Sequence, residues 1–293
     1  MTTHELRLGS CLDPVTGLAS LASKSIDHNF ADPPYEAEAH SKGRRVLKSK
    51  HDHGIRKTTA HMIAYPPITE AERAAVSAEI VRVTRRWALV FCQAEAVHLW
   101  RACLEAAGAK HWRIGCYRKI GAQPQISGTG PGVGWEAIEI VWCGGVGQSW
   151  QAGGKVAVWS HTREGRFPHG PVFRDGQKPL SLLEEITRDF SKPGDLILDP
   201  YAGAATTLVA CKRLGRSAIG WELDPATHAK ALARLEATEP AEGWEQSRSK
   251  GKQARLDTGP KVTRPERSLS SASGGASPSL PLVSLDTQEG RTE

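Results

Sequence analysis

Apolar and polar positions along the chain follow two alternating patterns. Short apolar runs predict buried strands at 26–31, 87–93, 195–200 and 217–222. Apolar residues recur with helical spacing at 71–87, 94–108, 181–190, 206–215 and 225–237. Strands that alternate with helices in this way favour a doubly wound, mostly parallel α/β sheet of the Rossmann-like type.

Two further apolar runs, 112–118 and 135–142, enclose a loop rich in glycine and proline. They predict an antiparallel hairpin within the otherwise parallel sheet. Trp150 and Trp159 fall in predicted loops, where they are minor candidates for contacts with nucleic acid.

Several residues mark helix ends. Gly108 is a natural C-terminal stop, and Ser181 with Glu184 has the capping-box spacing. Pro225 suits the first turn of the last predicted helix.

The composition changes beyond residue 238. The segment 239–293 is rich in Ser, Gly and Pro and poor in large apolar residues, so we predict a disordered tail. No apolar run approaches the roughly 20 residues that span a bilayer, and the first residues lack the apolar core of a signal peptide. We therefore expect a soluble, cytoplasmic protein.

Positive charge is concentrated in one segment. The formal net charge of the chain is +6, and the segment 40–57 alone holds seven basic residues against Asp52. Such a concentration favours a polyanionic partner, with nucleic acid the first choice, although a basic run is also compatible with a solvated loop. The candidate phosphate contacts are Lys42, Arg44, Arg45, Lys48 and Lys50.

Four histidines, at positions 40, 51, 53 and 61, lie in or near this basic segment. They have no acids or cysteines at metal-ligand spacing, and the six cysteines of the chain form no C-x-x-C pair. We expect no metal site.

The first predicted strand ends in Asp32-Pro33-Pro34-Tyr35. Two consecutive prolines fix φ and remove two backbone donors, so this loop can hold one rigid shape. A rigid loop that carries a carboxylate and an aromatic ring suits a flat, polar ligand. Taken alone, the same four residues also fit a surface turn.

A second candidate site lies between Asp199 and Glu222. The strand that ends at Pro200 is followed by a turn at Gly203 and a helix that begins near Thr206, whose free N–H groups can face a ligand. Glu222 ends the next strand, where an acid can accept both hydroxyls of a ribose. The full G-x-G-x-x-G dinucleotide pattern is absent from this turn.

Together these motifs resemble the β class of S-adenosylmethionine-dependent DNA amino-methyltransferases, in which a D-P-P-Y motif precedes the cofactor motif. The resemblance covers roughly residues 5–238 and rests on LRLGSCLDPVTGLASL, DPPY, QKPLSLLEEI, DPYAGAATT and LGRSAIGWELDP, in that order. It implies a methyltransferase domain over 1–238, with a catalytic half at 1–143 and a cofactor half at 177–238. Several motifs in the family's order are more specific than any one of them, so the resemblance disfavours the interpretation of DPPY as a surface turn.

The resemblance implies a chemical role for each residue of the DPPY loop. The Asp32 side chain and the Pro33 carbonyl would accept the two N–H bonds of an exocyclic amine and free its lone pair. Pro34 would keep these acceptors preorganised. Tyr35 would stack on a base that has been flipped out of the duplex.

The resemblance also implies a set of cofactor contacts. Lys178 and Pro179 correspond to the family motif beside the methionine carboxylate, and Glu222 would hold the ribose. The methionine part would face the turn and the helix start, formed by Asp199, Tyr201, Ala202, Gly203, Ala205, Thr206 and Thr207.

Two positions depart from the family pattern. Ala205 replaces a glycine, which is tolerable if its φ is negative and unfavourable if the site requires a positive φ. Ser10 stands where relatives often carry an acid, so one cofactor contact is expected to be missing.

The implied partner is double-stranded DNA, contacted by insertions at 36–69 and 144–176. Aspartate at the first motif position favours adenine N6 as the target. Cytosine N4 and a catalytically decayed DNA-binding relative are the alternatives. A homodimer and a cognate restriction endonuclease are left open as partners.

Overall fold

The structure is a computed structural model that describes residues 2–36, 66–122, 128–145, 150–162 and 176–243. The five basic residues predicted to contact phosphates, the four histidines near them and nearly all of the predicted tail lie outside the described residues. Within the described part of the chain, every helix is too short or too polar to cross a membrane.

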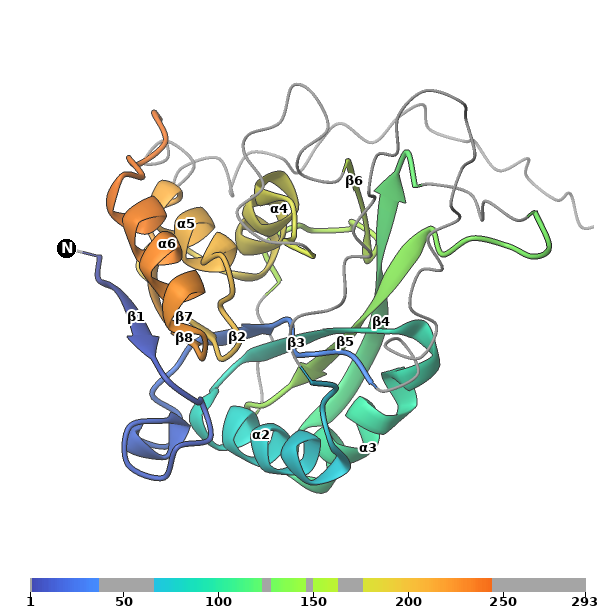
Figure 1. The fold of residues 1–293 in the computed structure, drawn as a ribbon, viewed down its shortest axis with the longest axis horizontal. Coiled ribbons are helices and arrows are strands. Elements are labelled where there is room, and N and C mark those ends of the chain that lie inside the picture. Colours follow the sequence, from blue (N-terminus) through green and yellow to red (C-terminus); the bar gives the residue numbers. More distant parts are fainter. Residues whose placement is uncertain (1, 37–65, 123–127, 146–149, 163–175, 244–293) are drawn as a thin grey trace, which may run out of the picture. The chain divides into compact units, whose positions relative to one another are not determined.

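One eight-stranded sheet organises the described residues, with strand order β1-β8-β7-β2-β3-β5-β4-β6 (Figure 1). The strands are β1 (His4–Leu8), β2 (His28–Ala31), β3 (Trp87–Cys92), β4 (Lys110–Ile120), β5 (Trp135–Trp142), β6 (Val158–Thr162), β7 (Leu196–Asp199) and β8 (Ser217–Glu222). Neighbouring strands are parallel except β5, which runs antiparallel to both β3 and β4. The predicted mostly parallel sheet and its antiparallel hairpin are confirmed.

Helices cover both faces of this sheet, and Figure 1 shows the two layers on opposite sides of the strands. One layer holds the short 3-10 helix η1 (Leu18–Ser20), α2 (Glu70–Val83) and α3 (Val97–Ala106), with η2 (Ala94–Ala96) leading into α3. The other layer holds α4 (Leu180–Phe190), α5 (Thr206–Arg213) and α6 (Pro225–Glu236). The fold is therefore doubly wound, as the alternation of strands and helices predicts.

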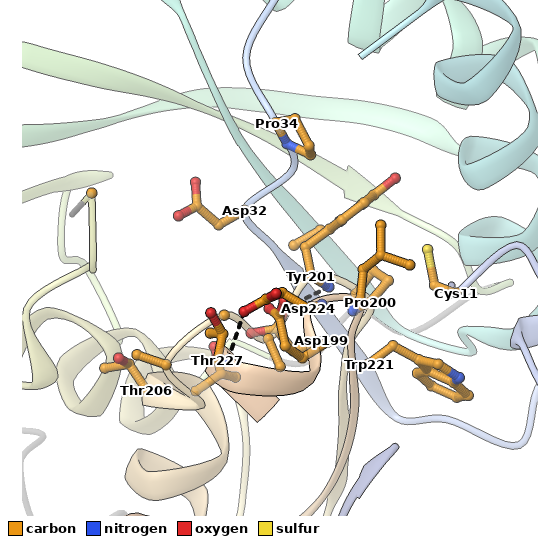
Figure 2. Close-up of a pocket in the computed structure, with 18 of the residues that line it drawn as sticks. Cys11, Asp32, Pro34, Asp199, Pro200, Tyr201, Thr206, Trp221, Asp224 and Thr227 are labelled. Carbon is orange, nitrogen blue, oxygen red and sulfur yellow. Dashed lines mark hydrogen bonds between the residues drawn. The ribbon is translucent and has the colours of Figure 1, made fainter. Parts of the chain in front are cut away.

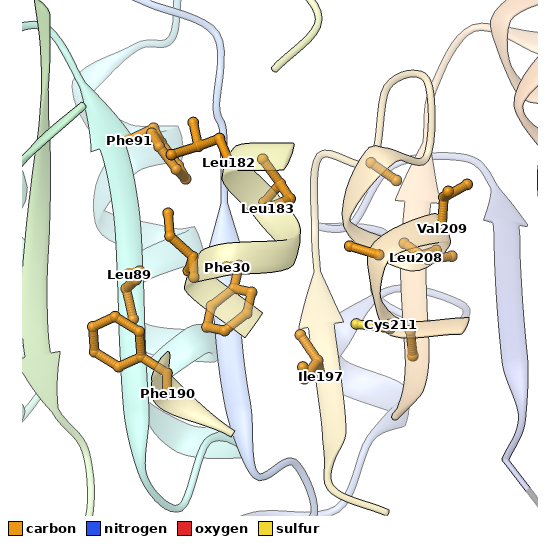
Figure 3. Close-up of a cluster of buried hydrophobic side chains, with 14 of the residues drawn as sticks. Phe30, Leu89, Phe91, Leu182, Leu183, Phe190, Ile197, Leu208, Val209 and Cys211 are labelled. Carbon is orange, nitrogen blue, oxygen red and sulfur yellow. The ribbon is translucent and has the colours of Figure 1, made fainter. Parts of the chain in front are cut away.

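The buried strands have apolar residues on both faces, which explains their continuous apolar runs. In β3, Leu89 and Phe91 belong to the core under α4 and α5, whereas Val90 packs in the core under α2 and α3. Figure 3 shows the first core, where Phe30 of β2 meets Phe190 of α4 at a ring-centroid distance of 6.3 Å. Successive side chains of a strand point to opposite faces, so one run of six residues serves two cores.

The capping box predicted at Ser181 is wrong. Helix α4 begins one residue earlier, at Leu180, and its N-cap is Pro179, which makes no side-chain cap hydrogen bond. The Ser181 hydroxyl is instead hydrogen-bonded to the His161 ring at 2.9 Å. The reciprocal capping box in the described residues lies at the start of α2, between Thr69 and Glu72.

The end of the sheet also differs from the prediction. Trp159, expected in a loop, lies in β6 and is completely buried, and its indole N–H donates to Asp189 at 2.7 Å. Trp150 packs edge-on against Phe190 at 4.8 Å. The short strand β6 has one buried apolar residue, Trp159, beside the exposed Val158 and three polar residues, so its pattern is too weak to predict. Trp159 is thus a core residue and is removed as a candidate for contact with DNA.

Candidate active site

The carboxyl ends of β2, β7 and β8 meet at one edge of the sheet. The chain leaves β2 towards α2 on one face and leaves β7 towards α5 on the other, so the pair β2–β7 is a topological switch point. A cavity of about 670 Å³ opens there, a size that suits a small-molecule ligand (Figure 2).

The cavity brings together the two motifs that the sequence places far apart. Its lining includes Asp32 and Pro34 from the DPPY loop and most of the predicted cofactor contacts. Those contacts are Lys178, Asp199, Tyr201, Ala202, Gly203, Thr206, Thr207 and Glu222. Four predicted site residues, Pro33, Tyr35, Pro179 and Ala205, lie outside this lining.

The turn after β7 is held tightly against β8. The Ala202 amide donates to the Trp221 carbonyl at 2.8 Å, and the Tyr201 amide donates to Asp199 Oδ1 at 3.1 Å. Gly220 makes this close packing feasible, because an added Cβ would lie 2.9 Å from Leu208 Cδ1 and 3.0 Å from Ala202 Cβ. We name residues 199–227, from the end of β7 to the start of α6, the cofactor edge.

Ala205 occupies the conformation that is unfavourable for alanine. Its φ of 57° and ψ of 30° place it in the left-handed region, and its side chain is completely buried. It is the N-cap of α5 and forms no side-chain cap hydrogen bond, since alanine has no side-chain acceptor. Glycine adopts this conformation without strain, so the departure from the family pattern carries a conformational cost.

Glu222 lies at the end of β8, 6% exposed, and lines the cavity as predicted. Its Oε1 accepts the Asp224 amide at 2.8 Å. Asp224 also lines the cavity and caps α6, accepting the Thr227 amide at 2.7 Å. Asp224 was missed as a site residue, although an acid immediately before Pro225 is a recognisable helix-start signal.

Asp199 is an unusual acid at the end of β7. Burial raises the pKa of its carboxyl to about 7, against a smaller opposing effect of its hydrogen bonds with Thr207 and the Tyr201 amide. The nearby carboxyls of Asp32 and Glu222 raise it further. The cofactor edge is therefore rich in acids, and a cation bound beside Asp199 would favour its ionised form.

Asp32 projects into the cavity from the end of β2, with 30% of its side chain exposed. The ammonium group of Lys178 donates to both of its carboxylate oxygens at 2.6 Å. Lys178 Nζ also lies 5.6 Å from the centre of the Tyr35 ring and 5.2 Å from that of Phe91. The residue that the resemblance places beside the cofactor thus makes its close contacts with the DPPY loop.

A second carboxylate lies on the far side of the same ammonium group. Glu136, at the start of β5, has its Oε2 3.2 Å from Lys178 Nζ and its Oε1 2.5 Å from Lys119 Nζ. We name Asp32, Lys119, Glu136 and Lys178 the charge quartet. It contains two acids and two bases, so its formal charges balance.

The charges of the quartet stabilise one another. Burial opposes the ionisation of Glu136, but Lys178 and Lys119 outweigh it and lower its pKa to about 2. Burial likewise opposes the charge on Lys178, and Asp32 and Glu136 outweigh it, so the pKa of Lys178 rises. For Asp32, burial raises the pKa while Lys178 opposes the rise. Sequence reasoning missed Glu136, although an acid inside the apolar run 135–142 is a signal of a buried charge.

Two further contacts shape the loop before α5. Arg234 of α6 donates to the Ala204 carbonyl at 2.8 Å and to the Thr206 hydroxyl at 3.0 Å, and so ties the cofactor edge to the last helix.

Ser10 lines the cavity, and its hydroxyl accepts the Leu12 amide at 3.1 Å. In the described residues, no group of three or more His, Cys, Asp or Glu side chains is arranged to hold a metal ion.

Fold and cavity define a doubly wound α/β protein with an acid-lined ligand site at the switch point of its sheet. Within this class, residues 136–233 match the N6_N4_Mtase family, described as DNA methylase. A 61-residue stretch is 49% identical to the type II methyltransferase M2.DpnII of Streptococcus pneumoniae and covers 21% of this chain and 23% of that protein. The match thus spans about a quarter of the relative's length.

Solved structures extend the likeness to most of the chain. The M1.HpyAVI–SAM complex superposes with a TM-score of 0.57 at 17% identity, covering 80% of this chain and 100% of that one. The cytosine-N4-specific PvuII DNA methyltransferase superposes with a TM-score of 0.60 at 12% identity, covering 86% and 93%. The protein therefore has the fold of these methyltransferases.

Proposed function

We propose that the protein transfers a methyl group from S-adenosylmethionine to the exocyclic N6 amine of adenine in double-stranded DNA. The observation that carries the proposal is the single cavity that joins the Asp32 carboxylate to the acid-lined cofactor edge. The family match over residues 136–233 supports a DNA methylase.

The residues of the cofactor edge fit S-adenosylmethionine. Glu222 and Asp199 line the cavity; Glu222 would accept the hydroxyls of a ribose, and Asp199 would balance the positive charge of the methionine part. The N–H groups in the first turn of α5, which lack partners within the helix, and the backbone at Gly203 would give the cofactor close polar contacts. When bound, S-adenosylmethionine supplies an electrophilic methyl group on a sulfonium centre.

The DPPY loop would activate the amine. An exocyclic amine is a weak nucleophile because its lone pair is delocalised into the ring. The Asp32 carboxylate and the Pro33 carbonyl would accept its two N–H bonds, while Tyr35 stacks on the flipped base. Preorganised acceptors of this kind need little rearrangement during the reaction.

The residues Lys42, Arg44, Arg45, Lys48 and Lys50 would contact the phosphate backbone. Neutralising Arg44, Arg45 and Lys48 together should weaken binding to any duplex and lower the salt dependence of log affinity by about one unit per lost contact. A matched control neutralises Lys250, Lys252 and Arg255, three charges of the predicted tail. An unchanged salt slope in the first variant would reassign the segment as a solvated loop.

The proposed domain spans 1–238, with DNA-facing insertions at 36–69 and 144–176. The type II name of the matched relative supports a cognate restriction endonuclease as a partner. A homodimer is a further proposal, and the sedimentation of the purified protein tests it.

Cytosine N4 is the alternative target, because a structural neighbour is a cytosine-N4-specific enzyme. A decayed DNA-binding relative is the alternative from another class, motivated by the strained Ala205. Calorimetry separates the decayed relative from the enzyme, since a decayed site would bind no cofactor.

The decisive experiment expresses the protein in cells that lack endogenous DNA methylation. Mass spectrometry of the nucleosides would show N6-methyladenine if the proposal holds and N4-methylcytosine if the alternative holds. Sequencing that detects modified bases would then give the recognition site. The Asp32→Ala variant, expressed to the same level, is the control for host background.

A further inference from the structure

The charge quartet contains a lysine that two carboxylates share. Lys178 is 8% exposed at its side chain, and its two ammonium donors to Asp32 engage both carboxylate oxygens at 2.6 Å. A target amine that donates to Asp32 must compete with these two hydrogen bonds. An ammonium group this deeply buried is costly to leave without a counter-charge.

Glu136 has spare capacity to hold the ammonium group. Its Oε1 is bound to Lys119, whereas its buried Oε2 lies 3.2 Å from Lys178 Nζ and has no hydrogen bond of good geometry with any described residue. A small shift of Lys178 would convert this ion pair into a hydrogen bond. Lys119 fixes Glu136 from the other side, so the acceptor is held in place while the lysine moves.

We propose that Glu136 is a positioning residue that takes over Lys178 when Asp32 turns its oxygens to the target amine. The cation then stays paired throughout, and Asp32 is free to accept N–H bonds without leaving an isolated buried charge. The inference rests on the proposed function, and it deepens that function by assigning a residue outside the DPPY and cofactor motifs.

The exchange of partners has a consequence for stability that needs no substrate. Either carboxylate alone should suffice to hold Lys178, so Asp32→Asn and Glu136→Gln should each lower the Tm by a few degrees at most. Within the described part of the chain, the double variant leaves Lys178 without a close carboxylate. The loss of Tm in the double variant should exceed the sum of the two single losses by about 6 °C or more.

Two controls keep this test specific. Glu139→Gln neutralises another buried acid of β5, one that pairs with His111 and not with Lys178, and its effect should add to that of Asp32→Asn. Adding Lys178→Met to the double variant should remove the excess loss and restore folding where the double variant fails to fold. Additivity of Asp32→Asn and Glu136→Gln, or an excess loss that survives Lys178→Met, would overturn the proposal.

Activity gives the second readout. Glu136→Gln should lower the turnover number of methyl transfer about tenfold while the KM for the cofactor stays within twofold of wild type, and Glu139→Gln should leave both unchanged. Wild-type turnover in Glu136→Gln would overturn the role in transfer. Absence of methylation by the wild-type protein would reject the proposed function instead, and the stability cycle would still decide whether the two carboxylates exchange Lys178.

Discussion

The cofactor edge and the charge quartet meet at one cavity, which Asp32 and Lys178 of the quartet line, and they are built in opposite ways. The cofactor edge is one continuous segment, 199–227, whose shape comes from a strand end, a tight turn and two helix starts. The quartet is assembled from the ends of β2, β4 and β5 and from Lys178, two residues before α4, and it is held by charge. The first is a local structure, whereas the second exists only once the sheet has formed.

This difference suggests a division of labour. Backbone groups of the cofactor edge are fixed by the fold and suit a ligand that binds in one pose. Ion pairs of the quartet can exchange partners, which suits a group that must release one contact to make another. The two sides should therefore respond separately to mutation, one in cofactor affinity and the other in methyl transfer.

The largest expected effect separates the two sides most clearly. Asp32→Ala should reduce methyl transfer by at least about 10²–10³-fold, because a preorganised acceptor at the reacting amine is lost. Cofactor affinity, measured by calorimetry, should stay within a few-fold of wild type. A parallel loss of both would show that Asp32 also supports the cofactor edge.

Sequence reasoning succeeded on the cofactor edge because its signals are local. The strand end at Asp199, the turn at Gly203 and Pro225 at the start of α6 each predict the backbone around them, and the structure has them in place. The conformation of Ala205 could not be predicted, since the sequence alone left the sign of its φ open.

The quartet could not be predicted for a physical reason. Lys178 lies 146 positions from Asp32 in sequence, and their contact depends on β2 and α4 being brought to the same edge of the sheet. The pairing of β5 with β4 places Glu136 beside Lys119, and it is specified by the register of the hairpin. A sequence motif can name Asp32 and Lys178, but only the assembled sheet shows that they are bound to each other.

A smaller effect is expected at the other side of the cavity. Glu222→Ala should weaken cofactor binding by about 1–3 kcal/mol, because a buried ribose would lose its acceptor. The turnover number at saturating cofactor should change little, in contrast to Asp32→Ala. Calorimetry with the variant and a transfer assay at high cofactor concentration check the two halves of this expectation.

Cofactor binding should also depend on pH through Asp199. Its pKa of about 7 in the free protein means that it is largely protonated below that pH, whereas a cation bound beside it favours the ionised form. Binding below pH 7 therefore releases a proton. As the pH is lowered below 7, the cofactor affinity should fall by at most about tenfold per pH unit, and above pH 7 it should level off. Calorimetry between pH 5.5 and 8.5 measures this. Asp199→Asn should bind more weakly with no such slope.

The smallest effect concerns the conformation of the cofactor edge. Ala205 is left-handed and completely buried, so Ala205→Gly relieves about 1–2 kcal/mol of backbone strain and removes a buried methyl group worth about 0.8 kcal/mol. Glycine also adds conformational freedom to the unfolded chain, at a cost of about 0.5–1 kcal/mol, so the terms nearly cancel and the Tm should change by no more than about 3 °C.

Ala204→Gly is the matched control for this change, because Ala204 is also buried and lies one residue earlier, and its φ is not positive. It loses a similar methyl group without relief of strain, and glycine adds conformational freedom to the unfolded chain. Its Tm should fall, so the difference between the two variants isolates the strain at Ala205. If Ala205→Gly is destabilised as much as Ala204→Gly, the left-handed alanine costs the fold nothing, and the departure from the family's glycine is neutral for the cofactor edge.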